Sequence, residues 1–396
     1  MSGTATSAAA ETSPSALAHD LYADTYGTPA TGLWSAPGRV NLIGEHTDYN
    51  NGFVLPFAID RRTWCAVGER ADRSIVVTST LTGDDAQISL DALAPERLQG
   101  WSAYVFGVIW ALGEHGVDLT GRQGLNLAFA SNVPLGAGLS SSAAIECSVA
   151  VAVNELWDLG ISSKQLAKVC QLAENKAVGA PTGIMDQTAS LLGQPGHAVL
   201  LDCDSYHSEL VPLALSDAGL AVLVIDTRVT HAHATGGYAA RRESCERAAR
   251  ELGVVTLREL TEVSLPQART MLDPETFRRV RHIATENARV LETARVLHDA
   301  GPRAIGDLLV ASHASMRDDF EISVPQLDLA VETAMAHGAV GARMTGGGFG
   351  GAAIALAPIE MVDAIGDQVT RAYADAKYEP PVMFTVAPAG GAGRDA

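Results

Sequence analysis

Charged side chains are interleaved with apolar ones in GRVNLIGEHTDY, residues 38–49. Arg39, Glu45, His46 and Asp48 would be costly inside a core, yet a solvated loop does not need the run VNLI between them. A strand that leaves the core and enters a polar pocket satisfies both requirements, because fixed hydrogen-bonding groups then face a polar ligand. The segment therefore predicts a binding site for a ligand rich in hydroxyls or charge.

A loop of glycine and serine, NVPLGAGLSSSAA at residues 132–144, follows a predicted strand and opens a predicted helix. Gly136 and Gly138 permit positive φ and close approach of the backbone to a ligand. The serines 140–142 lie where the first helical N–H groups have no internal partner, which makes an anion site without any lysine. A serine hydroxyl there is also a plausible Mg²⁺ ligand. The alternative is a purely structural strand–turn–helix junction, which also favours glycine and a capping serine.

A second glycine cluster, TGGGFGG at residues 345–351, formally satisfies the dinucleotide pattern G-x-G-x-x-G. Its context disagrees, because a strand-like AAIALAP follows where a dinucleotide fold needs a helix. A flexible loop without a role is a second alternative. We favour a backbone cradle beside a phosphate or sugar, since so many glycines raise the entropy of the unfolded chain.

A single carboxylate, Asp186, stands in the apolar setting TGIMDQ, after a predicted helix that carries Glu174. An isolated aspartate beside a loop is most often a helix cap. An arginine close to it, such as Arg39, would instead keep it ionised and able to accept or orient a hydroxyl proton. The pair His231 and His233 has no cysteine or acid at ligand spacing, which disfavours zinc.

The composition excludes several classes of partner. The 28 basic and 46 acidic residues give a formal charge of −18, which argues against nucleic acid and anionic membranes as partners. None of the four lysines follows a glycine, so a P-loop is absent. Five scattered cysteines without C-x-x-C, a start without a signal-like apolar stretch and no run of ~18 apolar residues predict a cytoplasmic protein with reduced thiols.

Periodicity predicts an α+β protein of two lobes. Short strands are expected over residues 33–90, and further strands at GLNLAFA, HAVLLDC, LAVLVIDT, AAIALAP and VMFTVAP. Helices are expected over residues 90–116, from the serine loop to 158, and over 163–178, 238–253, 274–300, 302–316, 325–337 and 360–376. We expect a disordered tail over 1–18, an N-terminal lobe over 19–215 and a C-terminal lobe over 216–396.

Together, GRVNLIGEHTDYNNG, PLGAGLSSSAA, TGIMDQ and MTGGGFGG resemble the motifs of the GHMP small-molecule kinases. The first motif is similar to that of the branch that phosphorylates galactose, and the resemblance runs from about residue 20 to about residue 390. It implies a two-lobed GHMP kinase fold with a ribosomal-protein-S5-domain-2-like N-terminal lobe and a ferredoxin-like α/β sandwich as C-terminal lobe. The active site would lie in the cleft between them.

The resemblance also implies roles for individual residues. Phosphoryl transfer from MgATP to O1 of α-D-galactose would involve Asp186 and Arg39 as catalytic residues, and Mg²⁺ would be held by Ser142 and Glu174. The sugar would be bound by Glu45, His46, Thr47, Asp48, Gly183, Asp186 and Tyr238. The ATP phosphates would be held by Gly136, Ala137, Gly138, Leu139, Ser140, Ser141 and Ser142.

Two alternatives remain at this stage. The first is a kinase for a related sugar, such as N-acetylgalactosamine or L-arabinose. This depends on the room near C2 and C6 of the bound sugar, which a sequence does not show. A galactose- and ATP-binding sensor without turnover is disfavoured by the intact GLSSSAA and by Asp186. The oligomeric state is not predicted, and a monomer is compatible with the sequence.

Overall fold

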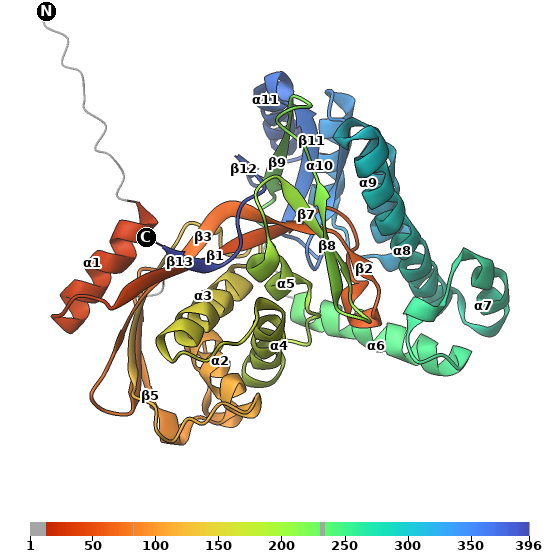
Figure 1. Ribbon diagram of the computed structural model, residues 1–396. Coiled ribbons are helices and arrows are strands. Elements are labelled where there is room, and N and C mark those ends of the chain that lie inside the picture. Colours follow the sequence, from red (N-terminus) through yellow and green to blue (C-terminus); the bar gives the residue numbers. More distant parts are fainter. Residues whose placement is uncertain (1–12, 82, 230–233, 396) are drawn as a thin grey trace, which may run out of the picture.

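The computed structural model describes residues 13–81, 83–229 and 234–395, and it has the two lobes and the mixture of helices and sheets that the sequence predicts (Figure 1). The N-terminal lobe occupies the lower left of Figure 1, and the C-terminal lobe its right side.

A six-stranded sheet in the order β13-β1-β3-β6-β4-β5 forms the frame of the N-terminal lobe. It is antiparallel except for the parallel pair β4 and β6. Its strands are β1 (Gly32–Asn41), β3 (Pro56–Glu69), β4 (Ser74–Ser79), β5 (Ala86–Ser89), β6 (Leu125–Ser131) and β13 (Gly393–Asp395).

Helices cover both faces of this sheet because its strands alternate apolar residues to either side. Cys65 and Leu127 face a core built with α2, α3 and α4, whereas Ala66 and Ala128 face α1. The helices of this lobe are α1 (Pro14–Tyr26), α2 (Ser102–Glu114), α3 (Ser141–Leu156), α4 (Ser163–Ala173) and α5 (Met185–Leu192).

The C-terminal lobe contains a four-stranded antiparallel sheet in the order β10-β11-β9-β12. Helices separate β9 from β10, β11 follows β10 directly, and α11 leads to β12, which is the β-α-β-β-α-β order of a ferredoxin-like lobe. Its strands are β9 (Leu220–Asp226), β10 (Gly341–Thr345), β11 (Ala352–Pro358) and β12 (Val382–Val386). Its helices are α6 (Ala234–Leu252), α7 (Leu265–Met271), α8 (Pro274–Ala300), α9 (Gly306–Ser315), α10 (Pro325–Ala336) and α11 (Val362–Asp375).

A small antiparallel sheet lies beside α8, with β7 between β2 and β8. Its strands are β2 (Phe53–Val54), β7 (His197–Asp202) and β8 (His207–Pro212). Two π-helical turns are Glu174–Val178 and Met316–Phe320. The 3₁₀ turns are Asp48–Asn50, Leu90–Ala92, Pro95–Arg97, Leu257–Glu259, Glu262–Ser264, Pro302–Ile305 and Ile359–Met361.

The two lobes share a hydrophobic core. One face of β9, with Val222 and Val224, packs in a single cluster with Val40 of β1 and Val290 of α8. The opposite face of β9 belongs to a second cluster with helices of the C-terminal lobe, α8 among them. Burial on both faces of the C-terminal sheet therefore fixes it against the N-terminal lobe.

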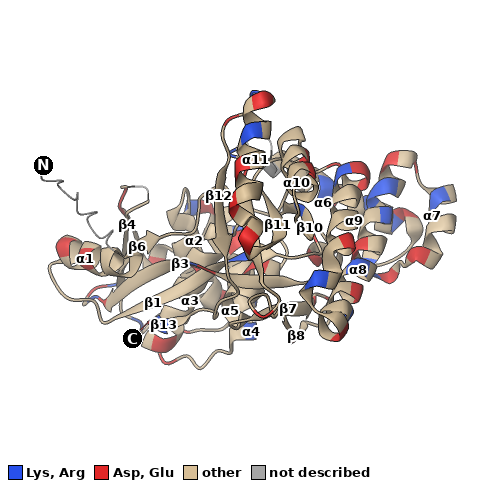
Figure 2. Ribbon diagram, turned by 90° about the horizontal axis from the view of Figure 1, so that it is seen from above, with Lys and Arg blue, Asp and Glu red and all other residues tan. Residues whose placement is uncertain are grey.

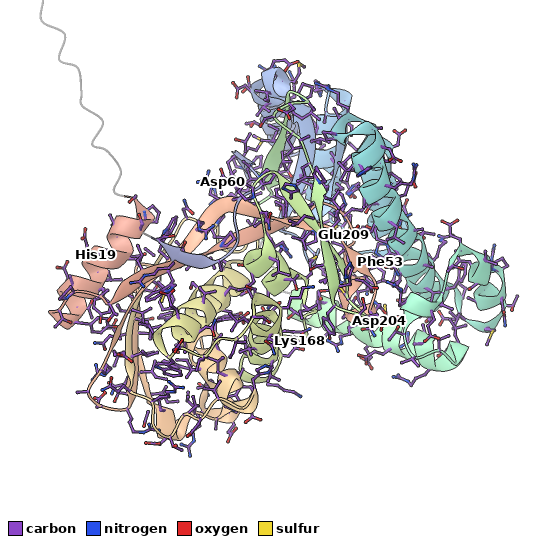
Figure 3. All side chains as sticks on the ribbon, in the orientation of Figure 1. His19, Phe53, Asp60, Lys168, Asp204 and Glu209 are labelled. Atoms are coloured by element: carbon purple, nitrogen blue, oxygen red, sulfur yellow. The ribbon has the colours of Figure 1, made fainter. Side chains whose placement is uncertain are left out.

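Further contacts tie the lobes together at the surface. Phe53 of β2 lies close to α8 in Figure 3, and the Arg258 guanidinium lies over its ring, 3.6 Å from the centroid. At the other end of the molecule, β13 pairs with β1, so residues 393–395 extend the N-terminal sheet although the sequence assigns them to the second lobe.

Three segments differ from the sequence-based expectation. Residues 56–69 form one long strand, β3, where only short strands are expected; Arg62 in its middle is held by the carbonyl oxygens of Gly390 and Gly391, to which it donates at 2.7 and 2.9 Å. Residues 90–101 form only two short 3₁₀ turns before α2 begins. The expected tail is helical from Pro14 onward, and residues 1–12 lie outside the described part of the chain.

Charged residues of both signs are interspersed along the helices of the C-terminal lobe (Figure 2), and several pair, as Arg278 does with Glu321 at 2.8 Å. None of the helices within the described residues has the length and hydropathy that a membrane crossing requires.

Candidate active site

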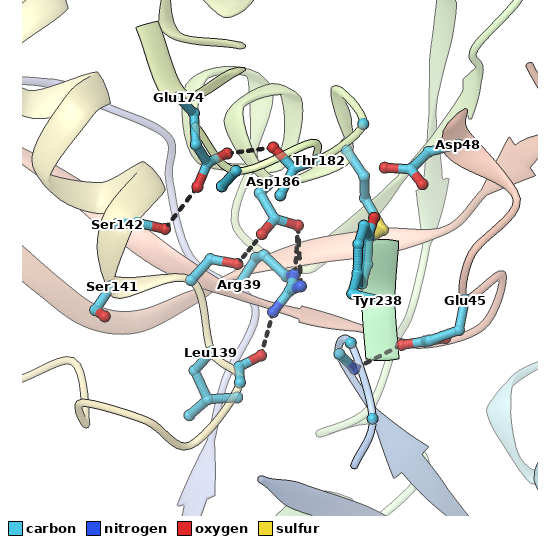
Figure 4. Close-up of a pocket in the computed structure, with 18 of the residues that line it drawn as sticks. Arg39, Glu45, Asp48, Leu139, Ser141, Ser142, Glu174, Thr182, Asp186 and Tyr238 are labelled. Carbon is cyan, nitrogen blue, oxygen red and sulfur yellow. Dashed lines mark hydrogen bonds and ion pairs between the residues drawn. The ribbon is translucent and has the colours of Figure 1, made fainter. Parts of the chain in front are cut away.

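A cavity of about 430 Å³ lies where the predicted motifs meet. From the N-terminal lobe it is lined by the segment after β1, the serine loop (residues 132–144) and the loop before α5. From the C-terminal lobe it is lined by α6 and the glycine loop (residues 345–351) (Figure 4). The predicted residues that line it are Arg39, Glu45, His46, Asp48, Gly136, Gly138, Leu139, Ser140, Ser141, Ser142, Glu174, Gly183, Asp186 and Tyr238.

An ion pair between Arg39 and Asp186 lies in the middle of the residues that line the cavity (Figure 4). Nε and Nη2 of Arg39 both lie 2.9 Å from Oδ1 of Asp186. Asp186 is in the first turn of α5, where the helix dipole favours a negative charge. The β-bulge between Pro37 and Arg39 redirects the end of β1, so the arginine faces the cavity.

The serine loop packs directly on β1. A Cβ at Gly38 would lie 2.5 Å from the carbonyl oxygen of Leu139, and that oxygen accepts a hydrogen bond from the Arg39 backbone at 3.0 Å. Arg39 Nη1 also donates to the carbonyl oxygen of Gly138. The sequence predicts a loop close to Arg39 only through the resemblance; the close packing explains why a glycine precedes the arginine.

Ser140 differs in its role from the other serines. Its φ of 58° is left-handed, and its hydroxyl donates to Oδ2 of Asp186. The side chain therefore orients the carboxylate, while Ser141 and Ser142 begin α3, whose first-turn N–H groups provide an anion site. Gly136 and Gly138 have φ of 78° and 71°, the positive values that the sequence predicts for them.

Glu174 fits the predicted metal site. It lies in a π-helical turn, and it accepts hydrogen bonds from Ser142 Oγ at 3.1 Å and Thr182 Oγ1 at 2.6 Å. Gln187 Nε2 donates to it at 2.8 Å. Burial raises the pKa of Glu174, and all three of these donors are neutral, so a cation beside the carboxylate would stabilise its charge.

Within the described ranges, no group of three or more His, Cys, Asp or Glu side chains is placed to hold a metal. A site with one carboxylate and one hydroxyl is nevertheless suited to Mg²⁺, which keeps waters and binds substrate phosphates in addition to few protein ligands. His231 and His233 lie outside the described residues.

Asp48 lies on the side of the Arg39–Asp186 pair that faces away from Glu174, and it packs against Gly183 (Figure 4). A Cβ at Gly183 would lie 1.9 Å from Oδ2 of Asp48, so only glycine allows the carboxylate to take this place. Burial and the neighbouring Asp186 raise the pKa of Asp48 to about 6, against the N–H of Tyr49, which donates to it at 2.9 Å. Two carboxylates thus flank the centre of the cavity.

His46 belongs to an aromatic wall. Its ring lies 4.8 Å from the ring of Tyr238 and 5.0 Å from that of Phe320. Burial lowers the pKa of His46 to about 3, so the ring is neutral. The carbonyl of Gly347 can only accept, so Nε2 donates to it at 3.1 Å, and Nδ1 accepts from Tyr49 at 2.7 Å. Both ring nitrogens are engaged, and His46 holds the glycine loop to the sugar motif, as we call residues 38–49.

Glu45 reaches the cavity from a buried position and is held on both oxygens. Arg343 Nη2 donates to Oε2, and the backbone N–H of Gly346 donates to Oε1 at 2.8 Å. Burial raises the pKa of Glu45, and the guanidinium and the N–H oppose this rise.

Two predicted residues do not line the cavity. Thr47 is buried and donates to the carbonyl oxygens of Gly44 and Phe53 at 2.9 and 2.6 Å, so it shapes the loop rather than the pocket wall. Ala137 is packed into the core shared by the lobes.

The cavity also contains residues that the sequence did not predict, among them Tyr104 and Thr182. Gly346, Gly347 and Gly348 line it too, as expected for a cradle. A Cβ at Gly346 would lie 3.0 Å from the carbonyl oxygen of Gly138, so the glycine loop and the serine loop are in contact. Neither dinucleotide geometry nor an idle loop describes this arrangement.

Comparison with known proteins identifies the family of this chain. The model described as the galactokinase galactose-binding signature matches residues 20–69, and the GHMP kinases N terminal domain and GHMP kinases C terminal models match residues 103–194 and 296–375. A galactokinase of Streptomyces coelicolor is 48% identical over 378 residues, which is 95% of this chain and 97% of that protein. The chain belongs to the galactokinase family.

Other members of the galactokinase family are similar to this chain over most of its length. One from Mycobacterium tuberculosis is 44% identical over 359 residues, covering 91% of this chain and 98% of that protein. A crystal structure of Lactococcus lactis galactokinase complexed with galactose has a TM-score of 0.90 at 31% identity and covers 96% of this chain and 99% of that chain. The expected GHMP kinase fold and the expected ATP-dependent sugar kinase family are both confirmed.

Proposed function

We propose that the protein transfers the γ-phosphate of MgATP to O1 of α-D-galactose, giving α-D-galactose 1-phosphate and ADP. The observation that carries the proposal is the Arg39–Asp186 ion pair, which separates a wall rich in hydroxyl-binding groups from a helix N-terminus suited to phosphates. The reacting oxygen and the γ-phosphate would meet at this pair. The crystal structure of the relative from Lactococcus lactis with galactose supports the choice of sugar.

The sugar would occupy the side of the cavity lined by Glu45, Asp48, Gly183 and Tyr238. Carboxylates accept hydrogen bonds from sugar hydroxyls, and the Tyr238 ring supplies an apolar face. The neutral His46 would support this wall through its contacts with Tyr49 and the glycine loop rather than through a charge.

The phosphates would lie on the other side, over Gly136, Gly138 and the first turn of α3. This arrangement needs no lysine, which agrees with the absence of a P-loop. When bound, Mg²⁺ would neutralise phosphate charge, and Ser142 with Glu174 would hold it.

Asp186 would accept or orient the proton of O1, and Ser140 and Arg39 would fix the direction of its oxygens. Arg39 would also stabilise negative charge on the transferred group. Catalysis of this kind depends on in-line positioning and charge stabilisation more than on covalent steps.

We place the protein in the cytoplasm, where sugar kinases find ATP. All five cysteines are free thiols buried in the fold, which supports a reducing compartment.

The proposal is tested by ADP release from ATP with D-galactose, N-acetylgalactosamine, D-glucose, L-arabinose or no sugar, each with and without Mg²⁺. We expect strong release that requires both galactose and Mg²⁺. Release that is equal with every sugar, or galactose binding without ADP release, would contradict it.

A further inference from the structure

A buried group of charges lies directly behind the sugar motif. Arg343 of β10 and Glu286 of α8 are both fully buried, and Glu45 is 1% exposed. Arg343 Nη2 contacts Oε2 of Glu45 and lies 3.6 Å from Oε1 of Glu286. The C-terminal lobe thus supplies a cation to a carboxylate that faces the cavity from the N-terminal lobe.

The orientation of the guanidinium is fixed by the backbone beside Glu45. Arg343 Nη1 donates to the carbonyl oxygens of Asn41 and Leu42 at 3.2 and 3.1 Å. Since Nη2 reaches Glu45, one arginine holds the whole turn from residue 41 to residue 45. The opposite edge of the carboxylate is held by the backbone N–H of Gly346 at 2.8 Å.

Glu286 fixes the same turn from α8. Its Oε1 accepts from the backbone N–H of Gly44 at 3.0 Å and from Ser312 Oγ at 2.6 Å, and its Oε2 accepts from Arg289 Nε at 2.7 Å. His282 on the same helix contacts the carbonyl oxygen of Glu45 through Nε2 at 3.1 Å. Two arginines balance two glutamates, so each buried charge has a partner.

We propose that Arg343 is a positioning residue that sets sugar selectivity by holding the Glu45 carboxylate at a fixed place on the cavity wall. The proposal rests on the proposed role of Glu45 as a sugar ligand. A carboxylate has about four acceptor positions, and the donors from β10 and the glycine loop leave at least one free for a sugar hydroxyl. A fixed acceptor rejects sugars that lack that hydroxyl, whereas a mobile one tolerates them.

The test is kcat/KM for galactose and for each of its monodeoxy derivatives, measured for the unmodified protein and for Glu45→Gln, Arg343→Met and the double variant. We expect Glu45→Gln to reduce the discrimination against one particular deoxy sugar by about tenfold or more, as loss of a hydrogen bond to a charged group does. Arg343→Met should reduce the discrimination against the same deoxy sugar, with KM for ATP unchanged.

The double variant should be about as selective as the less selective of the two single variants, because both changes remove the same interaction. The matched control is Arg279→Met, since Arg279 is also buried, at 1% exposed, but pairs with Glu321 and Glu275 instead of Glu45. The control is expected to keep the selectivity of the unmodified protein even if it lowers thermal stability.

Different outcomes separate this inference from the proposed function. If Glu45→Gln changes no selectivity, Glu45 does not bind the sugar and the inference falls with that role. If Glu45→Gln changes it but folded Arg343→Met does not, or lowers kcat/KM for all sugars equally, Arg343 is only structural. If Arg343→Met does not fold, Glu286→Gln decides: a weaker change at the same hydroxyl supports the inference, and unchanged selectivity overturns it.

Discussion

Asp186 is held by two neighbours of different character. Arg39 provides a charge at 2.9 Å, and Ser140 provides a neutral donor from a left-handed residue of the serine loop. A backbone in this region is unfavourable for a serine, so its presence beside the reacting carboxylate is the kind of strain found at functional sites. The pair of contacts fixes both oxygens of Asp186.

Replacing Asp186 tests whether it takes part in proton transfer. Asp186→Asn keeps the size of the side chain but removes its ability to accept a proton, so we expect kcat to fall by at least ~10², with a modest change in galactose affinity. Steady-state kinetics and galactose titration measure the two effects. Asp24→Asn, at an exposed position, is the control, and near-normal turnover of Asp186→Asn would contradict the role.

The pH dependence of sugar use should reflect Asp48. Burial and Asp186 raise its pKa to about 6, so below about pH 6 the group becomes neutral and loses an acceptor for a sugar hydroxyl. We expect kcat/KM for galactose to fall as the pH decreases through 6. Asp48→Asn should have lower activity without this inflection; an unchanged inflection in the variant would assign it to another group.

At the scale of elements, the site depends on loops that can approach one another only through glycine. Gly183 lies between α4 and α5 and leaves room for Asp48, while Gly346 leaves room for the serine loop. Gly183→Ala should therefore displace Asp48 and raise KM for galactose about tenfold, which corresponds to about 1.4 kcal/mol, with little effect on KM for ATP.

The matched control is Gly121→Ala, because a Cβ at Gly121 would meet no atom within 4 Å. Both variants are compared by steady-state kinetics with each substrate varied in turn. Equal changes in the two KM values of Gly183→Ala would indicate general loosening of the site instead of a displaced Asp48.

Sequence patterns predict the elements well where periodicity is strong, as in α8 and α10. They also predict the sugar motif, the serine loop and the glycine loop. They do not predict β3 as one strand, because Asp60 and Arg62 resemble a polar turn until their partners near the C-terminus are known. The sequence does not predict the role of Glu286 behind the sugar motif, for a similar reason. Its neighbours His282 and Arg289 have ordinary helical spacing, and only the tertiary structure shows that this side of α8 is buried behind the sugar motif.

Most of the predicted site residues line the cavity because their motifs meet there, but Thr47 and Ala137 do not. The resemblance implies a sugar contact for Thr47, but its hydroxyl is used by the backbone of its own loop. Arg343 precedes the glycine loop by two residues, and nothing in the local sequence indicates its contact with Glu45.

At the scale of the whole molecule, the shared core couples the lobes. We expect one cooperative unfolding transition, because separation of the lobes would expose the cluster that joins β1, β9 and α8. All five tryptophans lie between residues 34 and 157, so their fluorescence reports the N-terminal lobe, whereas circular dichroism reports helices of both lobes. The two denaturation curves should coincide.

Leu309→Ala extends this test. Leu309 is fully buried in the shared core but belongs to α9, so the variant should lower the free energy of unfolding by about 2–5 kcal/mol and shift the tryptophan transition as well. Leu291→Ala, at a residue 42% exposed on α8, is the control. A shift in circular dichroism alone would show that the lobes unfold independently.

The central claim is that O1 of the sugar and the γ-phosphate meet at Arg39 and Asp186. The most direct measurement is phosphorus NMR of the product formed from galactose and MgATP. We predict a single phosphate monoester whose phosphorus couples to the anomeric proton of α-galactose. A phosphate on another hydroxyl, or inorganic phosphate alone, would contradict the account.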